Sequence, residues 1–264
     1  LAPAGFNEKA LVVGYGMAEC SLAVSFSRPG KGLAVDPVDL ELLSGERRAV
    51  PVDPADNKGA YASKSVVSCG QPMPEYQIQV RDGLGQVLPD RHVGRLYVRG
   101  PSVMSGYFDN ENTTRDVLSD DGWLNTGDMA YIADNHIFIT GRAKDLVIVD
   151  GRWVWPQDIE SIAEQIPEVR MGDAAAISVP GEDGQDAVVL LLQCRQPDQT
   201  KQSGLTQRIQ RLIRRKMGVA CKIELVPRHT LSRTTSGKLA RARVRQAYLE
   251  SMARTAKTVK YAEI

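Results

Sequence analysis

The chain has 264 residues, of which 42% are apolar and 25% are charged, and its formal net charge is +1. This length suits one large domain or two ordinary ones, and the composition excludes a collagen, a coiled coil and wholesale disorder. The sequence holds no run of about 18 apolar residues, so we expect no membrane-spanning helix. Its first residues lack the basic start and apolar stretch of a secretion signal.

The cysteines and histidines point away from a disulfide framework and from zinc. Cys20, Cys69, Cys194 and Cys221 form no CxxC pair, and the three histidines are scattered. Free thiols are typical of reducing compartments, so we predict a cytoplasmic protein.

Charge is distributed unevenly along the chain. Residues 201–264 hold 16 Lys and Arg against 3 Asp and Glu, whereas residues 1–200 hold 17 against 29. A basic block suits an anionic partner, such as nucleic acid, a phosphate-bearing ligand or an acidic protein. It is equally typical of solvated helix faces without a partner, and by charge alone both interpretations stay open.

The first half of the chain is predicted to be mainly β. An apolar run that stops at Gly14 predicts a buried strand over residues 8–13, and residues 28–65 form a loop-rich excursion with one short hairpin. Period-2 alternation then predicts three strands, at residues 77–81, 95–99 and 135–140. Short strands between Gly, Pro and Asp turns favour a small antiparallel sheet or an open, barrel-like subdomain.

The pattern changes after Gly151 to an α+β domain. Helices are predicted over residues 156–166, 205–217 and 239–254, and strands over 174–179, 187–194 and 222–226. The strand at 187–194 is apolar enough to be central. We place the boundary near Arg142–Asp145, which gives domains of residues 1–142 and 143–264.

Glycines follow the first predicted strand, at Gly14-Tyr15-Gly16-Met17-Ala18-Glu19. Loops at the carboxyl ends of strands line ligand crevices in open α/β sheets, and glycine permits a close backbone approach. Tyr15 is suited to stack on a flat ring, and Glu19 to hold a hard cation such as Mg²⁺. The plainer alternative is a glycine turn that opens a helix.

A carboxylate and a guanidinium follow later turns. Asp128, in Thr126-Gly-Asp128, is able to accept two hydroxyl hydrogen bonds, as a ribose diol requires. Arg142 lies 14 residues further on, a separation over which two strands can fold back and bring both side chains together. Arginine also suits two-point recognition of phosphate. The alternatives are an aspartate that caps a turn and a surface salt bridge.

A polar loop, Leu231-Ser-Arg-Thr-Thr-Ser-Gly-Lys238, precedes the last predicted helix. Ser236 is a candidate N-cap, which puts Lys238 in the first helical turn. A cation there is unfavourable unless an anion offsets it, so Lys238 is the residue that local physics most clearly marks as functional.

Taken together and in order, five stretches resemble landmarks of the adenylate-forming superfamily, which includes acyl-CoA synthetases, peptide-synthetase adenylation domains, luciferases and fatty acyl-AMP ligases. The stretches are Tyr15-Gly-Met-Ala-Glu19, Gly94-Arg-Leu-Tyr-Val-Arg-Gly100 with Val103-Met-Ser-Gly-Tyr107, Thr126-Gly-Asp128, Gly141-Arg-Ala-Lys-Asp145 and Thr235-Ser-Gly-Lys238.

The resemblance implies a role for each motif. Tyr15 would stack on adenine, Asp128 would bind the ribose hydroxyls, and Glu19 would help to bind Mg²⁺. Lys238 would contact the carboxylate and the α-phosphate of ATP during adenylation. Gly16, Met17, Thr140 and Arg142 complete the implied ATP/AMP-binding set, with Arg142 on the ribose or phosphate side. Lys144 and Asp145 would form the hinge about which the C-terminal domain rotates.

Within the superfamily the chain looks most like a fatty acyl-AMP ligase. Ala18 stands where many relatives carry Thr, and Ser68-Cys-Gly-Gln-Pro72 also resembles usage in these ligases. Residues 28–65 match the place of the insertion that disfavours transfer to CoA in that family. The implied substrate is a fatty acid, and the implied acceptor is an acyl carrier protein, an acidic partner for the basic C-terminal block.

Two departures qualify the resemblance. Arg95 occupies a position where relatives commonly carry Glu, and the Ser/Thr/Gly-rich phosphate loop of the superfamily does not occur in this sequence. We therefore expect the chain to be the C-terminal half of a ligase, unable to catalyse adenylation by itself. The alternatives are a fragment of an acyl-CoA ligase or of a peptide-synthetase adenylation domain, and a non-catalytic basic module that binds nucleic acid.

Overall fold

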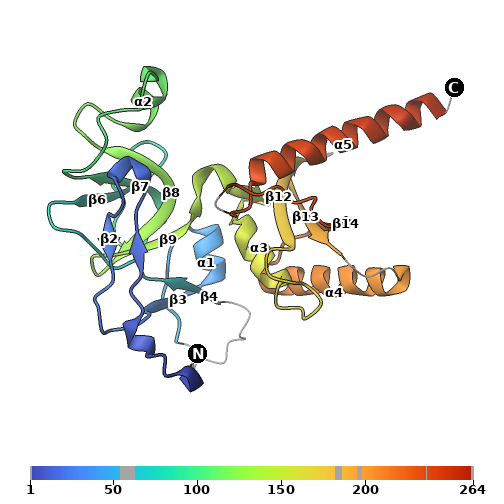
Figure 1. Ribbon diagram of the computed structural model, residues 1–264, viewed down its shortest axis with the longest axis horizontal. Helices are drawn as coiled ribbons and strands as arrows, with labels where there is room; N and C mark the ends of the chain where they lie inside the picture. Colours follow the sequence, from blue (N-terminus) through green and yellow to red (C-terminus); the bar gives the residue numbers. More distant parts are fainter. Residues whose placement is uncertain (1, 54–62, 182–185, 195–197, 236, 263–264) are drawn as a thin grey trace. The chain divides into compact units, whose positions relative to one another are not determined.

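The computed structural model describes residues 2–53, 63–181, 186–194, 198–235 and 237–262. Contacts divide the chain into two compact units, Leu1–Asp145 and Leu146–Ile264, which are treated separately below (Figure 1). Within the described ranges, no helix combines the length and the hydropathy needed to cross a membrane.

The first unit is built on a four-stranded antiparallel sheet. Its strands, in spatial order, are β6 (Gln77–Arg81), β7 (Gly94–Arg99), β8 (Leu124–Ala133) and β9 (His136–Arg142). The three strands predicted from alternation are confirmed as β6, β7 and β9. Strand β8 was not predicted, because its buried run carries no clear period.

The sheet does not close. Strands β6 and β9 lie at opposite ends of the hydrogen-bonded order, so the ladder formed by the described residues is open. The expected barrel-like subdomain is therefore wrong, and the simpler alternative, a small antiparallel sheet, holds.

The first unit also contains shorter elements. They are the 3₁₀ helices η1 (Ala2–Ala4), η2 (Glu8–Ala10), η3 (Ala18–Cys20) and η4 (Ala143–Asp145), strands β1 (Gly14–Tyr15), β2 (Ser25–Phe26), β3 (Val35–Asp39), β4 (Ser63–Val67) and β5 (Gln71–Pro72), and helices α1 (Leu40–Gly45) and α2 (Glu111–Val117). The predicted strand over residues 8–13 is wrong. It begins as η2, and its apolar Leu11 and Val12 are 42% and 46% exposed, so burial does not hold this run in a strand.

The segment predicted as a loop-rich insertion is partly regular. Strands β3 and β4 pair antiparallel, but α1 follows β3 directly and lies between the two strands in the sequence, so the pair is not the short hairpin that was predicted. The N-cap of α1 is Asp39, whose side chain accepts a hydrogen bond from the Leu42 amide. The middle of the insertion, residues 54–62, lies outside the described residues.

A buried polar contact ties this insertion to the main sheet. Asp36 Oδ2 accepts hydrogen bonds from Arg91 Nη1 at 3.0 Å and from the Tyr131 hydroxyl at 2.7 Å. Tyr131 is fully buried and its ring stacks on Phe138, with centroids 4.8 Å apart. Because burial penalises an unpartnered hydroxyl, Asp36 removes a free-energy cost at Tyr131, and it also forms an ion pair with Arg91, whose side chain is partly exposed.

We predict that Asp36→Ala lowers the free energy of unfolding of the first unit by about 1–3 kcal/mol, since it removes the acceptor of the buried Tyr131 hydroxyl and the ion-pair partner of Arg91. Calorimetric melting of the chain measures the change. Glu46→Ala breaks an ion pair whose side chains are more than half exposed and is the matched control, with an expected change below about 0.5 kcal/mol. Equal effects of the two substitutions would contradict the prediction.

The second unit is a three-stranded sheet with helices on both faces. Its central strand β13 (Asp186–Gln193) runs antiparallel to β12 (Ala174–Pro180) and parallel to β14 (Cys221–Val226). Helices α3 (Pro156–Ala163) and α4 (Gln199–Met217) share one core cluster with one face of the sheet. Helix α5 (Arg241–Ala262) packs on the other face through Val244 and Tyr248.

The predicted elements of this unit are confirmed, with shifted ends. The central position of β13 is confirmed, and so is the apolar face of α4, where Leu205, Ile209 and Ile213 are buried. A short hairpin, β10 (Val147–Val149) with β11 (Arg152–Val154), precedes α3 and was not predicted.

The predicted start of the last helix is wrong. Helix α5 begins at Arg241, so Lys238 lies in a loop and not in a first helical turn. The loop closes on itself instead, because Thr234 bonds to Lys238 through both its amide and its hydroxyl. The candidate N-cap Ser236 lies outside the described residues.

Candidate nucleotide-binding site

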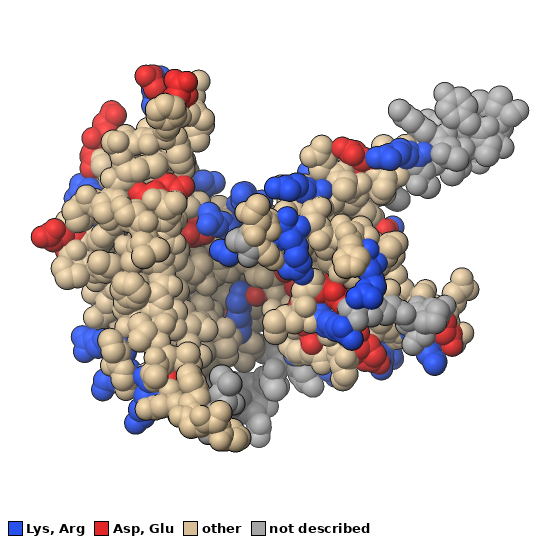
Figure 2. Space-filling model, viewed as in Figure 1, with Lys and Arg blue, Asp and Glu red and all other residues tan. Residues whose placement is uncertain are grey.

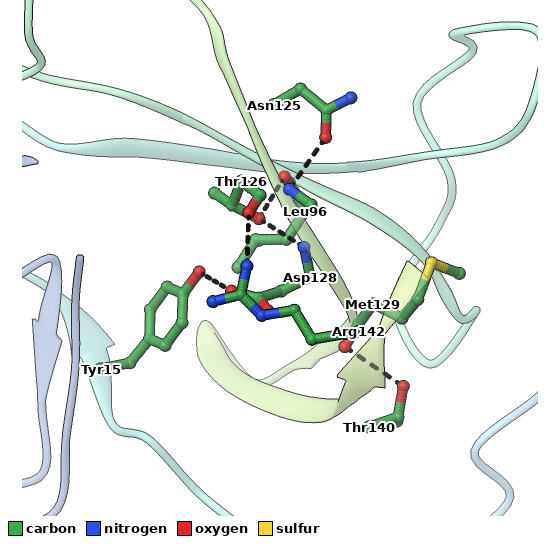
Figure 3. Close-up of polar contacts among 9 residues, drawn as sticks. Tyr15, Leu96, Asn125, Thr126, Asp128, Met129, Thr140 and Arg142 are labelled. Atoms are coloured by element: carbon green, nitrogen blue, oxygen red, sulfur yellow. Dashed lines mark hydrogen bonds and ion pairs between the residues drawn. The ribbon is translucent and has the colours of Figure 1, made fainter. Parts of the chain in front are cut away.

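Strands β8 and β9 bring a carboxylate and a guanidinium together. Asp128 and Arg142 are direct partners in the β8–β9 register, as their spacing predicted. Arg142 Nε lies 2.8 Å from Asp128 Oδ1, and the Tyr15 hydroxyl donates to Asp128 Oδ2 at 2.6 Å (Figure 3). Residues from three separate sequence motifs therefore meet at one aspartate.

The backbone before Asp128 is shaped by an irregularity in the pairing of β7 with β8. Gly127 has φ +72°, a conformation that favours glycine, and its amide donates to the Asn125 side chain. The Thr126 hydroxyl donates to the Leu96 carbonyl and accepts from the Asp128 amide. This pattern fixes where the Asp128 carboxylate points, as Figure 3 shows.

Burial governs the protonation of Asp128. The side chain is 6% exposed, while that of Arg142 is 51% exposed. Burial raises the pKa of Asp128 above its ordinary value, although the Tyr15 hydrogen bond and the Arg142 charge both act to lower it. Burial and the neighbouring Asp128 carboxylate also raise the pKa of Tyr15, so its phenol stays a donor.

A pocket of about 430 Å³ lies beside this pair. Met17, Glu19, Arg142 and Lys144 of the predicted set line it, together with Thr126 and Gly127. The Asp128 carboxylate is not part of the lining. It contributes to the pocket indirectly, by holding the side chain of Arg142.

Glu19 is the candidate ligand of a divalent cation. Its Oε1 accepts a hydrogen bond from the Tyr107 hydroxyl at 2.8 Å, and it lines the pocket. Mg²⁺ is commonly held by one or two carboxylates, with substrate phosphates and water completing its shell. Among the described residues, no three His, Cys, Asp or Glu side chains form a metal cluster, so Glu19 suits that shared mode of binding and not an all-protein cage.

Besides Asp128 and the hinge residue Asp145, three further predicted residues of the first unit lie outside the pocket lining. Tyr15 reaches the site through its hydroxyl. Close packing of the backbone requires glycine at position 16, because a Cβ there would lie 1.8 Å from the Leu22 carbonyl oxygen. Thr140 is 4% exposed, and its hydroxyl donates to the Met129 carbonyl at the β8 bulge. A ligand role for these three stays a prediction.

Comparison with known proteins places the chain in a family. Residues 3–108 match the model of the AMP-binding enzyme family, and residues 151–244 match that of the AMP-binding enzyme C-terminal domain. The chain belongs to the adenylate-forming, AMP-binding superfamily. The predicted resemblance is thereby confirmed.

The relatives include both acyl-CoA and acyl-AMP enzymes. A putative acyl-CoA synthetase of Caulobacter vibrioides is 46% identical over 94% of this chain and 43% of its own length. A long-chain fatty acid–AMP ligase of Mycolicibacterium smegmatis is 31% identical over 97% of this chain and 46% of its own. The chain therefore spans less than half the length of these curated relatives.

The fold agrees with a solved member of the superfamily. A structure from a study of fatty acyl-adenylate ligases of E. coli and L. pneumophila superimposes with a TM-score of 0.86. The two sequences are 38% identical, and the superimposed part covers 96% of this chain and 44% of the solved chain. The mixed α/β class is confirmed at this level.

The superfamily motifs pointed to fewer pocket residues than the structure reveals. Arg95, noted in the sequence only as a departure, lines the pocket from β7 with an exposed side chain. Asn125 and Asp116 also line it, and Tyr107 positions Glu19. The alternation that predicted β7 was the signal that could have placed Arg95 on an outward face; for Asp116 no sequence signal existed.

Lys238 lies in the second unit, on the loop before α5, and its side chain is exposed. Lys and Arg side chains are spread over this unit among Asp and Glu (Figure 2). Ion pairs engage several of them, including Arg241 with Glu160 and Arg208 with Glu168. The basic block is thus partly neutralised within its own fold.

Proposed function

We propose that the chain is part of a fatty acyl-AMP ligase. In the parent reaction a fatty acid carboxylate oxygen attacks the α-phosphorus of ATP, the bond to the bridging oxygen breaks, and acyl-AMP and pyrophosphate form. The observation that carries the proposal is the Asp128–Arg142 pair at the edge of a pocket in a chain of the AMP-binding superfamily.

The first unit supplies the nucleotide side of the site. Each Asp128 oxygen accepts one internal hydrogen bond and keeps a further lone pair, which a ribose hydroxyl would have to reach past Arg142, because the carboxylate does not line the pocket. Arg142 is half exposed, so its guanidinium is able to face the pocket while it holds Asp128. Glu19 would hold a magnesium ion, which supplies positive charge beside the phosphates.

The second unit supplies a cation. The Lys238 ammonium would contact the attacking carboxylate and the α-phosphate, where negative charge grows in the transition state. Such preorganised charge is often the largest single contribution to catalysis.

Two features favour a carrier protein over CoA as acceptor. Residues 28–65, which match the family insertion in position, form β3, α1 and β4 in their described part, and Asp36 ties them to the sheet. The basic C-terminal block suits an acidic partner. The second candidate is an acyl-CoA ligase, favoured by the Caulobacter relative's name.

We predict that Asp128→Asn in the full-length ligase weakens AMP binding by about 10- to 100-fold, the effect of losing a hydrogen bond to a charged group. Asp120→Asn, an exposed aspartate in the same unit, is the control and should bind normally. Since the pKa of Asp128 is raised, its protonation on acidification weakens AMP binding at a higher pH than for an ordinary aspartate. That step disappears in Asp128→Asn. Titration calorimetry across the acid range measures both effects, and unchanged affinity would remove Asp128 from the site.

We predict that Lys238→Ala in the full-length ligase slows adenylation by about a hundredfold or more, because it removes a charge that stabilises the transition state. AMP affinity falls much less than the rate, because the proposed adenine and ribose contacts lie in the first unit. Pyrophosphate exchange measures the rate, and Lys201→Ala, an exposed lysine on α4, is the control. An undiminished exchange rate would exclude Lys238 from the mechanism.

We predict that the full-length ligase transfers its acyl group to the phosphopantetheine thiol of a carrier protein in preference to CoA. Both acceptors are offered together with a fatty acid and ATP, and the two thioesters are quantified by mass spectrometry. Efficient acyl-CoA formation would favour the acyl-CoA ligase instead.

A further inference from the structure

The loop that carries Lys238 is a closed turn. The Ala240 amide donates to the Ser232 carbonyl, and the Thr234 amide donates to the Lys238 carbonyl at 2.8 Å. The Lys238 amide in turn donates to the Thr234 hydroxyl at 3.1 Å. The backbone of Lys238 is therefore held, whereas its side chain is exposed.

Arg233 connects this turn to the body of the second unit. Its Nη1 donates to the Gly237 carbonyl at 2.9 Å, and its Nη2 donates to the Gly172 carbonyl at 2.6 Å. Gly237 immediately precedes Lys238, while Gly172 lies in the segment between α3 and β12. One planar guanidinium thus bridges two carbonyls, a geometry that the single ammonium of lysine does not reproduce.

The far end of this bridge is anchored as well. The Gly172 amide donates to Glu164 Oε1 at 2.6 Å, directly after the last turn of α3. One turn earlier, Glu160 pairs with Arg241, the first residue of α5, through Nε at 3.1 Å. The end of α3 therefore fixes the Lys238 turn both before and after the lysine.

We propose that Arg233 is a positioning residue that acts through Lys238. It holds the Gly237 carbonyl against Gly172 and so fixes the point from which the Lys238 side chain extends. This inference rests on the proposed function, in which the Lys238 ammonium meets the reacting phosphate. The lysine stem has a fixed reach, so a held backbone limits where the ammonium can lie, and small displacements of a charge from the reacting atoms cost rate.

The test uses pyrophosphate exchange by the full-length ligase. Arg233→Ala and Arg233→Lys should each lower kcat by about 10- to 100-fold, with little change in KM for ATP, because the nucleotide residues are untouched. Gly172→Ala approaches the same bridge from its other end, since a Cβ there would lie 2.5 Å from Arg233 Nη2 and φ is +81°. It should show the same loss of kcat.

Arg243→Ala is the matched control. Arg243 is an exposed arginine of α5 with no polar partner among the described residues, so its loss removes the same charge and should leave kcat unchanged. Wild-type kcat in both Arg233 variants, or an equal loss in Arg243→Ala, would overturn the proposal.

A double-mutant cycle separates positioning from general stability. If Arg233 acts through Lys238, Arg233→Ala causes no further loss of kcat in a Lys238→Ala background. An equal proportional loss in both backgrounds would show a role independent of Lys238 and overturn the inference. Full activity of Lys238→Ala alone would instead overturn the proposed role of the lysine, on which this inference rests.

Discussion

The buried carboxylate of Asp128 is the constraint on which the first unit depends. A charge at this depth is tolerated because a phenol and a guanidinium meet it, one from β1 and one from the end of β9. Satisfying one aspartate therefore brings distant motifs into register. The same arrangement presents a half-exposed arginine to a pocket, so the electrostatic requirement of the fold and the geometry of the site have a common origin.

The second unit combines an exposed side chain with a fixed backbone. In the proposed function the Lys238 side chain has to be exposed to meet the substrate, while the backbone of its loop has to be held in place. Glu160 and Glu164, both near the end of α3, hold Arg241 and Gly172, and Arg233 links Gly172 to the turn. An exposed functional side chain is thus supported by partners on a packed helix.

Sequence reasoning succeeded where the signal is local or periodic. The alternation of β6, β7 and β9 and the apolar face of α4 were predicted, and the Asp128–Arg142 spacing matched a strand pair. The prediction of a strand over residues 8–13 failed because the apolar residues there are exposed. Strand β8 was missed because its burial pattern has no clear period. The start of α5 was misjudged because Thr234 closes a turn that competes with helix formation.

Long-range polar partners had no sequence signal at all. Asp36 lies 55 residues from Arg91 and 95 from Tyr131, separations at which no spacing rule applies. Arg233 and Gly172 are 61 residues apart. Residue type alone marks such groups as polar, and only the packed fold shows which of them are joined.

The contact of Asp36 with Tyr131 also limits which segments can be deleted from this chain during evolution. Excision of the segment around β3 and α1 would leave a phenol in the sheet interior and a guanidinium at its edge without their shared acceptor. A shortened descendant would need replacements at positions 91 and 131 at the same time, so the insertion and the sheet are expected to evolve as one unit.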